Sequence, residues 1–258
     1  MRISRALALA GIDSRRKCEA YVLNGAVRLN GEVVRDLGRQ VDLEKDSITF
    51  RGRGLNLQKF VYYILNKPMG YSTTAWDPHA LKTVFDLLPG ELAPRTVKSH
   101  RTRVFPVGRL DRNSTGLLLF TNDGEIANRL THPRYGVGKW YEVKLDRALE
   151  PFDMRRLVEG VRLEEGWVNA EKITKLSRRR LQVLIREGKK REVRRIFEKL
   201  EYEVLELCRV AFGPILLGDM QLGHGRFLTP AEISTLKGAV YETPTTKKRP
   251  SDKTSSGR

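Results

Sequence analysis

The sequence predicts an α+β protein, in which a larger domain with a mostly antiparallel mixed sheet follows a small α/β domain. The chain has 258 residues, 40% of them hydrophobic, which is enough for one large domain and one small one. Its apolar strand-like runs are broken by single helix-like segments, a pattern typical of antiparallel sheets. Near residue 51, arginines and glycines interrupt the apolar periodicity, which predicts a linker over residues 51–59.

The N-terminal domain, residues 1–50, is expected to contain two short helices followed by a hairpin. Asp13 is expected to cap the second helix by accepting hydrogen bonds from its first turn. Asn30-Gly31 suits a two-residue hairpin turn, because both residues tolerate the positive φ angles that such a turn needs. The expected elements are helices over residues 2–10 and 14–23, and strands over residues 26–29 and 32–34.

Basic residues gather on this N-terminal domain. Three of them occupy the first turn of the second helix, where positive charge opposes the helix dipole and costs some stability. That placement favours a role in ligand binding, and a solvated basic face is the alternative. The residues expected to contact a polyanion are Arg2, Arg15, Arg16, Lys17 and Arg28.

The larger domain is expected to cover residues 60–240. Strands are expected near residues 60–65, 117–121, 140–145, 168–175, 181–186 and 204–210. Helices are expected at residues 82–88, 123–131, 151–159, 190–200 and 230–236. The remaining residues, 241–258, are rich in Thr, Lys, Ser and Pro with little apolar content, which predicts a disordered basic tail.

The charge balance indicates a polyanionic partner. Lys and Arg outnumber Asp and Glu by 48 to 31, so the net charge is +17, which favours nucleic acid over a membrane surface. No apolar run is long enough to span a membrane, and arginines interrupt the N-terminus, which argues against a signal peptide. Cys18 and Cys208 lie in unlike contexts, so we expect no disulfide and a cytoplasmic protein. The four histidines show no metal-ligand spacing, so we expect no metal, and we expect a monomer.

The stretch around Asp111 carries the strongest chemical signal. Asp111 follows Arg109 and precedes a short polar turn, after which Gly116 begins an apolar strand. A carboxylate at such a loop–strand junction, beside an arginine, is a candidate active-site acid because the cation favours its ionised form. Judged from these residue types alone, bonding a turn or pairing structurally is the more frequent role of such an aspartate.

The stretch Gly108–Gly124 resembles the catalytic signature of pseudouridine synthases that modify single uridines in ribosomal RNA. That signature has Gly-Arg-Leu-Asp, two variable residues, Thr or Ser, one variable residue and Gly-Leu-Leu, and Ser114 supplies the hydroxyl here. The N-terminal helices and hairpin resemble an S4-type RNA-binding domain. Further segments that resemble the synthase family, between about Phe60 and Leu236, are Asn66–Gly70, Thr83–Pro89, Leu130–Tyr135, Lys139–Tyr141 and Glu187–Phe197.

The resemblance implies roles for particular residues. Asp111 would be the essential carboxylate, Tyr141 would lie against the target base, and Arg194 would form a salt bridge with Asp111. Ile185 would pack on the other side of the base. The residues expected to bind the substrate or close its pocket are Arg109, Lys189, Lys190, Arg191, Leu207 and Arg209, and the basic loop Lys98–Arg103 is a further candidate for holding phosphates.

Two positions depart from the pattern that the resemblance implies. Glu192 stands where glutamine is usual, which places an additional carboxylate near the site. Trp140 stands where a small residue is usual, which bears on local packing more than on chemistry.

The reaction implied by the resemblance is isomerisation of uridine to pseudouridine in rRNA. The N-glycosidic bond breaks, the uracil turns, and its carbon 5 joins the sugar, so no cofactor is expected. Segments such as Tyr71–Thr74 and Thr83–Leu88 favour 23S rRNA, with 16S rRNA as the alternative target. A non-catalytic RNA-binding factor for ribosome assembly is the rival from another class, and a metal-dependent nuclease would need clustered carboxylates that the sequence lacks.

Overall fold

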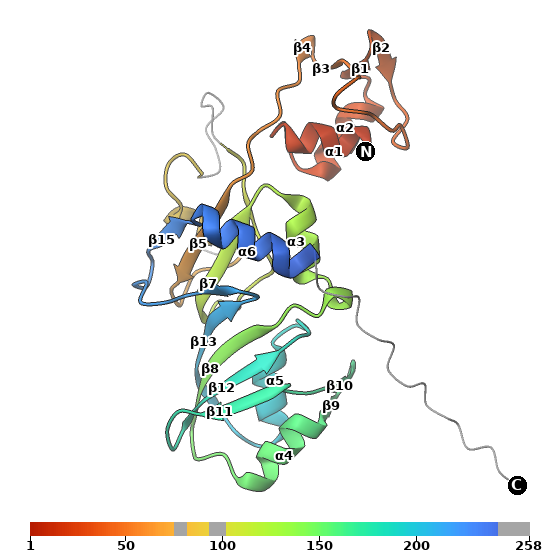
Figure 1. The fold of residues 1–258 in the computed structure, drawn as a ribbon. Coiled ribbons are helices and arrows are strands. Elements are labelled where there is room, and N and C mark those ends of the chain that lie inside the picture. The colour runs from red at the N-terminus through yellow and green to blue at the C-terminus, as the bar shows by residue number, and fades with distance from the viewer. Residues whose placement is uncertain (75–81, 93–101, 242–258) are drawn as a thin grey trace, which may run out of the picture. The chain divides into compact units, whose positions relative to one another are not determined.

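The computed structural model describes residues 1–74, 82–92 and 102–241, so the expected tail over residues 242–258 lies outside them. The described chain divides into two compact units (Figure 1). Unit 1 comprises Met1–Val61 and Pro89–Phe105, and unit 2 comprises Tyr62–Leu88 and the chain from Pro106 onward. The inclusion of Pro89–Phe105 in unit 1 was not expected from the sequence.

Unit 1 contains two helices and a four-stranded antiparallel sheet with the strand order β2-β1-β3-β4. Its elements are α1 (Ile3–Leu9), α2 (Arg15–Leu23), β1 (Val27–Leu29), β2 (Glu32–Val34), β3 (Ile48–Phe50) and β4 (Arg53–Gly54). The turn between β1 and β2 has φ angles of 52° at Asn30 and 92° at Gly31, as the expected hairpin requires. Apolar side chains of both helices and of the sheet form one core, which includes Ile3, Leu7, Cys18, Val22 and Val27.

Two expectations for this unit are corrected by the structure. The N-cap of α2 is Ser14, whose Oγ accepts from the Lys17 backbone N–H at 3.4 Å, and Asp13 instead accepts from the Ser14 N–H at 2.7 Å. Residues 51–54, placed in a linker from their composition, form a turn and strand β4. Arg51 and Gly52 both have positive φ and form a second tight turn, which joins β3 to β4.

Unit 2 is built on a mixed sheet whose main path runs β11-β12-β8-β13-β7-β5-β15 (Figure 1). Its neighbouring strands are antiparallel except for the parallel pair β13 and β7, which confirms the α+β class. The strands of this part of the chain are β5 (Tyr62–Lys67), β6 (Phe105–Pro106), β7 (Thr115–Thr121), β8 (Lys139–Leu145), β11 (Lys172–Lys175), β12 (Arg180–Ile185), β13 (Val204–Phe212), β14 (Ile215–Leu216) and β15 (Gly225–Phe227). A separate hairpin is formed by β9 (Val161–Leu163) and β10 (Gly166–Val168).

The helices of unit 2 cover two different parts of this sheet (Figure 1). Apolar residues of α4, α5 and the β9–β10 hairpin pack with β8, β12 and β13, whereas those of α3 and α6 pack with β5 and β7. The helical elements are η1 (Val84–Leu87), α3 (Gly124–Thr131), η2 (Pro133–Tyr135), α4 (Pro151–Glu159), α5 (Glu192–Lys199) and α6 (Pro230–Tyr241). The sheet is therefore divided between two hydrophobic cores, and the parallel strands β7 and β13 lie at the division.

The expected elements of unit 2 are largely present, with two differences. The single strand expected over 168–175 is two strands, β10 and β11, which belong to different sheets. The helix expected over 82–88 is a single 3-10 turn, closed by Asp86, whose carboxylate accepts from the Thr83 backbone N–H at 2.7 Å.

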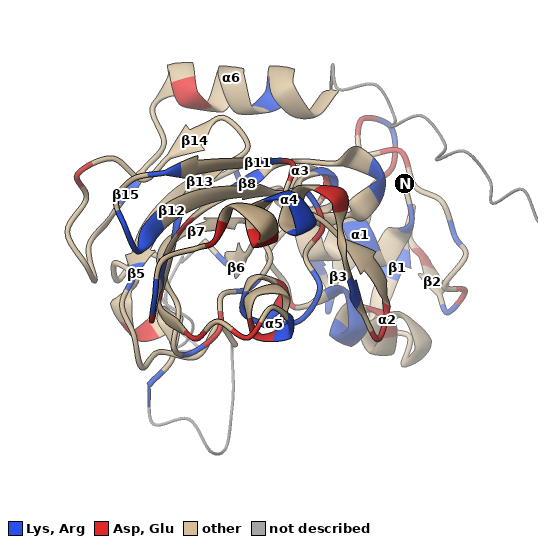
Figure 2. Cartoon of the chain, turned by 90° about the horizontal axis from the view of Figure 1, so that it is seen from below, with Lys and Arg blue, Asp and Glu red and all other residues tan. Residues whose placement is uncertain are grey.

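Lys and Arg residues are distributed over both units (Figure 2). Among the described residues, no helix combines the length and apolar character needed to cross a membrane.

Candidate active site

Asp111 lies in a tight turn immediately before strand β7. The Ser114 backbone N–H donates to the Asp111 carbonyl at 3.0 Å and closes the turn. The segment after β5 holds the turn from outside: the Gly70 N–H donates to the Arg112 carbonyl at 2.9 Å, and the Thr73 hydroxyl donates to the Leu110 carbonyl at 2.7 Å. The two segments 66–73 and 108–114, which the sequence resemblance treats as separate motifs, therefore form one structural element.

Lys67 is the internal anchor of this element. Its side chain is fully buried, and its ammonium donates to the carbonyl oxygens of Ser114 at 2.8 Å, Pro68 at 3.1 Å and Arg112 at 3.4 Å. Burial lowers the pKa of Lys67 to about 8, while the nearby Asp111 carboxylate acts in the opposite direction. Lys67 was not among the predicted site residues, although its position at the end of an apolar strand is a signal that could have pointed to it.

Gly116 brings the Asp111 turn close to strand β13. It lies opposite Arg209 in the parallel β7–β13 pair, with φ of 105°, and a Cβ there would lie 2.3 Å from the Arg209 carbonyl oxygen. Only glycine permits both this backbone conformation and this approach. The close contact places the buried Arg209 side chain beside the turn that carries Asp111.

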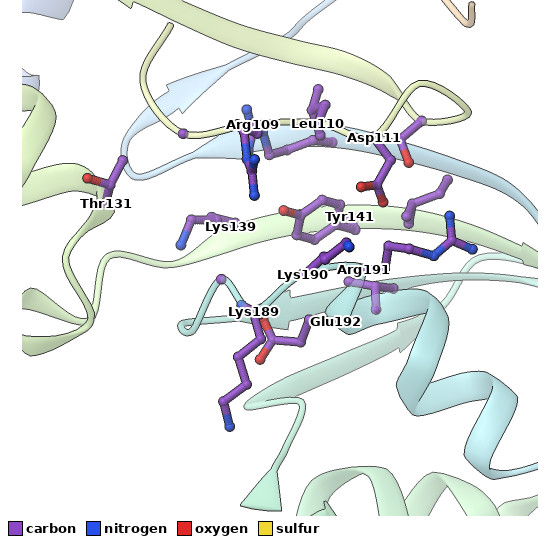
Figure 3. A pocket seen from close by; sticks show the side chains of 16 residues that line it. Arg109, Leu110, Asp111, Thr131, Lys139, Tyr141, Lys189, Lys190, Arg191 and Glu192 are labelled. Carbon is purple, nitrogen blue, oxygen red and sulfur yellow. Dashed lines mark hydrogen bonds between the residues drawn. The ribbon is translucent and has the colours of Figure 1, made fainter. Parts of the chain in front are cut away.

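A cavity of about 210 Å³ lies where these segments meet β8 and the start of α5 (Figure 3). Figure 3 shows Arg109 and Asp111 on one side of Tyr141, and Lys189 and Glu192 on the other. The structure thus brings together most of the predicted site residues from distant parts of the sequence. The predicted residues that line the cavity are Arg109, Asp111, Tyr141, Lys189, Lys190, Arg191, Leu207 and Arg209.

The floor of the cavity contains three buried charged residues. Lys139 on β8 donates to the Glu187 carbonyl at 2.7 Å, and burial together with the neighbouring Arg209 lowers its pKa to about 8. Glu192, the first residue of α5, accepts from the Lys189 N–H through Oε2 at 3.2 Å. Burial, and then the nearby Glu187, raise the pKa of Glu192 to about 7. Arg209 donates to the Leu117 carbonyl at 2.8 Å and lies over the Phe212 ring.

Arg194 does not form the expected salt bridge with Asp111. Its guanidinium donates to the carbonyl oxygens of Val204 at 2.7 Å and Asn113 at 2.9 Å, and the two charged groups do not pair within 4.0 Å in the described part of the chain. Burial lowers the pKa of Arg194, and the charge of the nearby Asp111 carboxylate partly offsets this effect. The side chain therefore ties the Asp111 turn to β13 through backbone groups.

The structure places Ile185, Trp140 and Arg195 outside the described lining of the cavity. Ile185 is buried in the core between β12 and its neighbours, and the described residues that line the cavity include Val193 and Leu207 but not Ile185. Trp140 lies beside Leu184 and Ala211 in the sheet and also does not line the cavity. Arg195 forms a two-pronged ion pair with Glu165, with both N–O distances at 2.7 Å, so it fastens α5 to the β9–β10 hairpin.

The basic residues predicted to bind RNA through unit 1 are all exposed. They are Arg2, Arg15, Arg16, Lys17 and Arg28. Lys17 lies 3.5 Å from Asp13, Arg15 lies 3.5 Å from Glu19, and Arg28 donates to the Gly31 carbonyl at 2.9 Å. Of the basic loop Lys98–Arg103, residues 98–101 lie outside the described residues, and Arg103 pairs with Asp13 at 3.7 Å.

Asp123, which could be imagined as a metal partner of Asp111, has a structural role. Its carboxylate caps α3 by accepting from the Glu125 and Ile126 N–H groups, and it accepts from the Tyr62 hydroxyl at 2.8 Å. Within residues 1–74, 82–92 and 102–241, no three His, Cys, Asp or Glu side chains are grouped so that they could hold a metal ion.

Comparison with known proteins places this geometry in a family. Residues 61–199 match the RNA pseudouridylate synthase family, and residues 1–48 match the S4 domain. The chain is 38% identical over 245 residues to an uncharacterized RNA pseudouridine synthase of Aquifex aeolicus, covering 93% of this chain and 95% of the relative. It is 37% identical over 243 residues to the ribosomal large subunit pseudouridine synthase B of Bacillus subtilis, covering 92% and 95%.

A solved structure supports the same assignment. A crystal structure of a pseudouridylate synthase superposes with a TM-score of 0.65 at 29% identity, covering 92% of this chain and 99% of the other. The family match over residues 61–199 includes Asp111, Tyr141 and the other residues that line the cavity, except Leu207 and Arg209 on β13. With a family match over more than half of its length and relatives aligned over more than nine-tenths of both chains, the chain belongs to the RNA pseudouridylate synthase family.

Proposed function

We propose that this chain converts a uridine of large-subunit ribosomal RNA, 23S rRNA, into pseudouridine, and that it acts as a cytoplasmic monomer. The observation that carries the proposal is that Asp111 and Tyr141 line one cavity whose other walls contribute cations. A carboxylate repels RNA phosphates, so a protein that only bound RNA would have no use for one in such a cavity. The large-subunit target is supported by relatives at 36–37% identity that carry that name.

The proposed chemistry needs the target nucleotide to leave its stack. Tyr141 offers a flat, half-buried ring on which the extruded uracil stacks, and contacts to the flanking RNA offset an unstacking cost of a few kcal/mol. Arg109, Lys190 and Arg191 are exposed at the rim of the cavity, where they can contact phosphates. Asp111 supplies the reacting carboxylate, while Lys67 and Arg194 hold its turn in place.

The reaction is balanced without a cofactor. The bond from the sugar C1′ to N1 of uracil breaks, the base turns, and a bond from C1′ to C5 forms. The hydrogen of C5 leaves as a proton, and N1 acquires a proton.

We also propose a domain boundary near residue 60. The S4-type part before it supplies affinity for RNA, and the part after it supplies the chemistry.

The proposal is tested by mapping pseudouridines in rRNA from cells with and without the gene. Loss of one 23S site, restored by the wild-type gene but not by Asp111→Asn, is the expected result, because the amide keeps the shape and removes the reacting group. Purified Asp111→Asn should bind a 23S transcript with unchanged affinity. Turnover of this variant within tenfold of wild type would contradict the role of Asp111. A site in 16S rRNA would contradict the target, and an unchanged rRNA would favour a binding-only factor.

A further inference from the structure

Glu192 carries a buried oxygen that the protein itself leaves unpaired. The residue is 5% exposed, its Oε2 accepts from the Lys189 N–H, and Oε1 has no hydrogen-bond partner among the described residues. A buried acceptor without a partner costs free energy, so such atoms in native proteins usually have a role. Glu192 lines the same cavity as Asp111 and Tyr141, so a bound ligand can supply the missing donor.

The position of Glu192 fits the far edge of a stacked uracil. Across Tyr141, Asp111 lies on one side and Glu192 on the other (Figure 3). If a base stacks on Tyr141 with its sugar carbon at Asp111, the ring atoms remote from the sugar point to the side of Glu192. In uracil those atoms include N3, which carries a hydrogen, and C4, which carries an oxygen. Of these, only N3–H can donate to a carboxylate.

The turning of the base adds a further argument. Exchanging N1 for C5 at the sugar requires a half-turn of uracil about the axis through N3 and C6. The half-turn interchanges the C2 and C4 carbonyl groups, whereas N3–H stays on the axis. A hydrogen bond to N3–H can therefore hold the base in the cavity before, during and after the turn.

We propose that Glu192 is a base-contacting specificity residue whose Oε1 accepts the N3–H of the target uracil and retains the base while it turns. The inference rests on the proposed function. Cytosine has an acceptor at N3 in place of a donor, so the same oxygen would repel it, and the contact would select uracil.

Binding of the base shifts Glu192 toward its charged, acceptor form, because the N3–H donor stabilises the anion. In the free protein, burial and then Glu187 raise the pKa of Glu192 to about 7, and the Lys189 backbone N–H, Lys139 on β8 and the Lys189 ammonium act in the opposite direction. Burial and the charge of Arg209 on β13 lower the pKa of Lys139, and Asp111 lines the same cavity. Lys139 also lines the cavity, but its pKa of about 8 leaves it mostly protonated between pH 5.5 and 7.5, and the described residues that line the cavity include no histidine.

The test is the pH dependence of the single-turnover rate at saturating RNA. The probe is a full-length 23S rRNA transcript labelled with tritium at C5 of its uridines, because forming the C5–C1′ bond releases that hydrogen. Between pH 7.5 and 5.5 the wild-type rate should fall by roughly tenfold or more, as Oε1 becomes protonated. Glu192→Gln should be slower at pH 7.5 but lose far less over this interval, because an amide does not titrate.

Further variants distinguish loss of the contact between Glu192 and the base from a general disturbance of the fold. Glu192→Asp keeps a titrating carboxylate but withdraws it, so it should retain the pH dependence at a lower rate. Lys139→Met should move the fall in rate to higher pH, because the anion loses a nearby cation. Glu198→Gln on the exposed side of α5 is the matched control and should reproduce the wild-type profile.

Three outcomes would overturn the inference. They are an identical pH dependence in wild type and Glu192→Gln, a wild-type rate that rises as pH falls, or a Glu198→Gln profile that matches Glu192→Gln. None of these would contradict the proposed function, which is tested separately by tritium release and pseudouridine formation in the wild-type enzyme.

Discussion

The buried ammonium of Lys67 donates to the carbonyl oxygen of Ser114 at 2.8 Å and so holds the turn that begins at Asp111. Lys67→Met keeps the length of the side chain but leaves the carbonyls of Ser114, Pro68 and Arg112 without this donor. We expect the rate of the chemical step to fall roughly a hundredfold, because a small displacement of a reacting group has that effect. Stability should fall on the order of 3 kcal/mol, because buried acceptors lose their partner.

Single-turnover kinetics at saturating RNA and urea denaturation measure these two effects. Lys199→Met, which removes an exposed cation from α5, is the control and should change neither quantity appreciably. An unchanged rate in Lys67→Met would show that the turn keeps its geometry without the lysine.

The close approach of strands β7 and β13 at Gly116 leads to a second prediction. Gly116→Ala would place a Cβ 2.3 Å from the Arg209 carbonyl oxygen and 2.6 Å from its nitrogen, in a residue with φ of 105°. Strands β7 and β13 must then separate, so we expect a loss of stability on the order of 3 kcal/mol and a strongly reduced rate. Gly124→Ala, at a helical position with open space around it, is the comparison and should leave the unfolding midpoint close to wild type. Similar midpoints for the two variants would mean that the β7–β13 contact is not tight.

Arg194 is predicted to act by positioning the Asp111 turn. Arg194→Met removes the hydrogen bonds to the Asn113 and Val204 carbonyls, so the single-turnover rate should fall while RNA affinity changes little. Arg194→Lys should restore the rate only in part, since an ammonium cannot reach both carbonyls with the geometry of a guanidinium. Arg195→Met serves as the neighbouring control, because Arg195 pairs with Glu165 away from the turn. Equal losses of rate in the two Met variants would contradict this assignment.

The sequence could predict the elements whose signals are local. The apolar run of β7, the Asn30-Gly31 hairpin and the boundaries of α4 follow from periodicity and turn chemistry, and the structure confirms them. The sequence does not separate β10 from β11, because nothing in the local pattern marks where a chain leaves one sheet and enters another.

The sequence motifs predict which residues form the candidate site but not which contacts hold these residues in place. The resemblance brought Asp111, Tyr141 and Arg209 together, and they share one cavity. The partners of Arg194 and the burial of Lys139 depend on contacts between segments distant in sequence, so no local signal specifies them. Ile185 shares the apolar face of β12 with Leu181 and Val183, and this face packs in the core; the sequence pattern shows that the face is apolar but not what it packs against.

Glu192 predicts a pH dependence of stability that does not require activity. Its pKa is raised from 4.5 to about 7 in the folded protein, so the folded state binds this proton more tightly than the unfolded state. The resulting stabilisation is present below about pH 4.5 and is lost as pH rises through 7. The free energy of unfolding of wild type minus that of Glu192→Gln should therefore decrease on the order of 2 kcal/mol between pH 4.5 and 7.5. Urea denaturation at several pH values measures this difference, and a difference that is constant with pH would show that Glu192 is not perturbed.

The exposed cations of α2 predict how RNA binding depends on salt. Arg15, Arg16 and Lys17 are exposed in the first turn of a helix whose dipole disfavours them, within a region that matches the S4 domain. If each contacts a phosphate, replacing all three with Ala should reduce the slope of log affinity against log salt concentration by roughly 2, at about 0.7–0.9 for each contact. The single-turnover rate at saturating RNA should stay at the wild-type value, because the cavity around Asp111 is untouched.

Lys45→Ala, which removes an exposed cation elsewhere in the same unit, is the control and should leave the slope unchanged. Filter binding of a 23S transcript over a series of salt concentrations measures the slope, and the same slope for the triple variant and wild type would show that these cations do not contact the RNA.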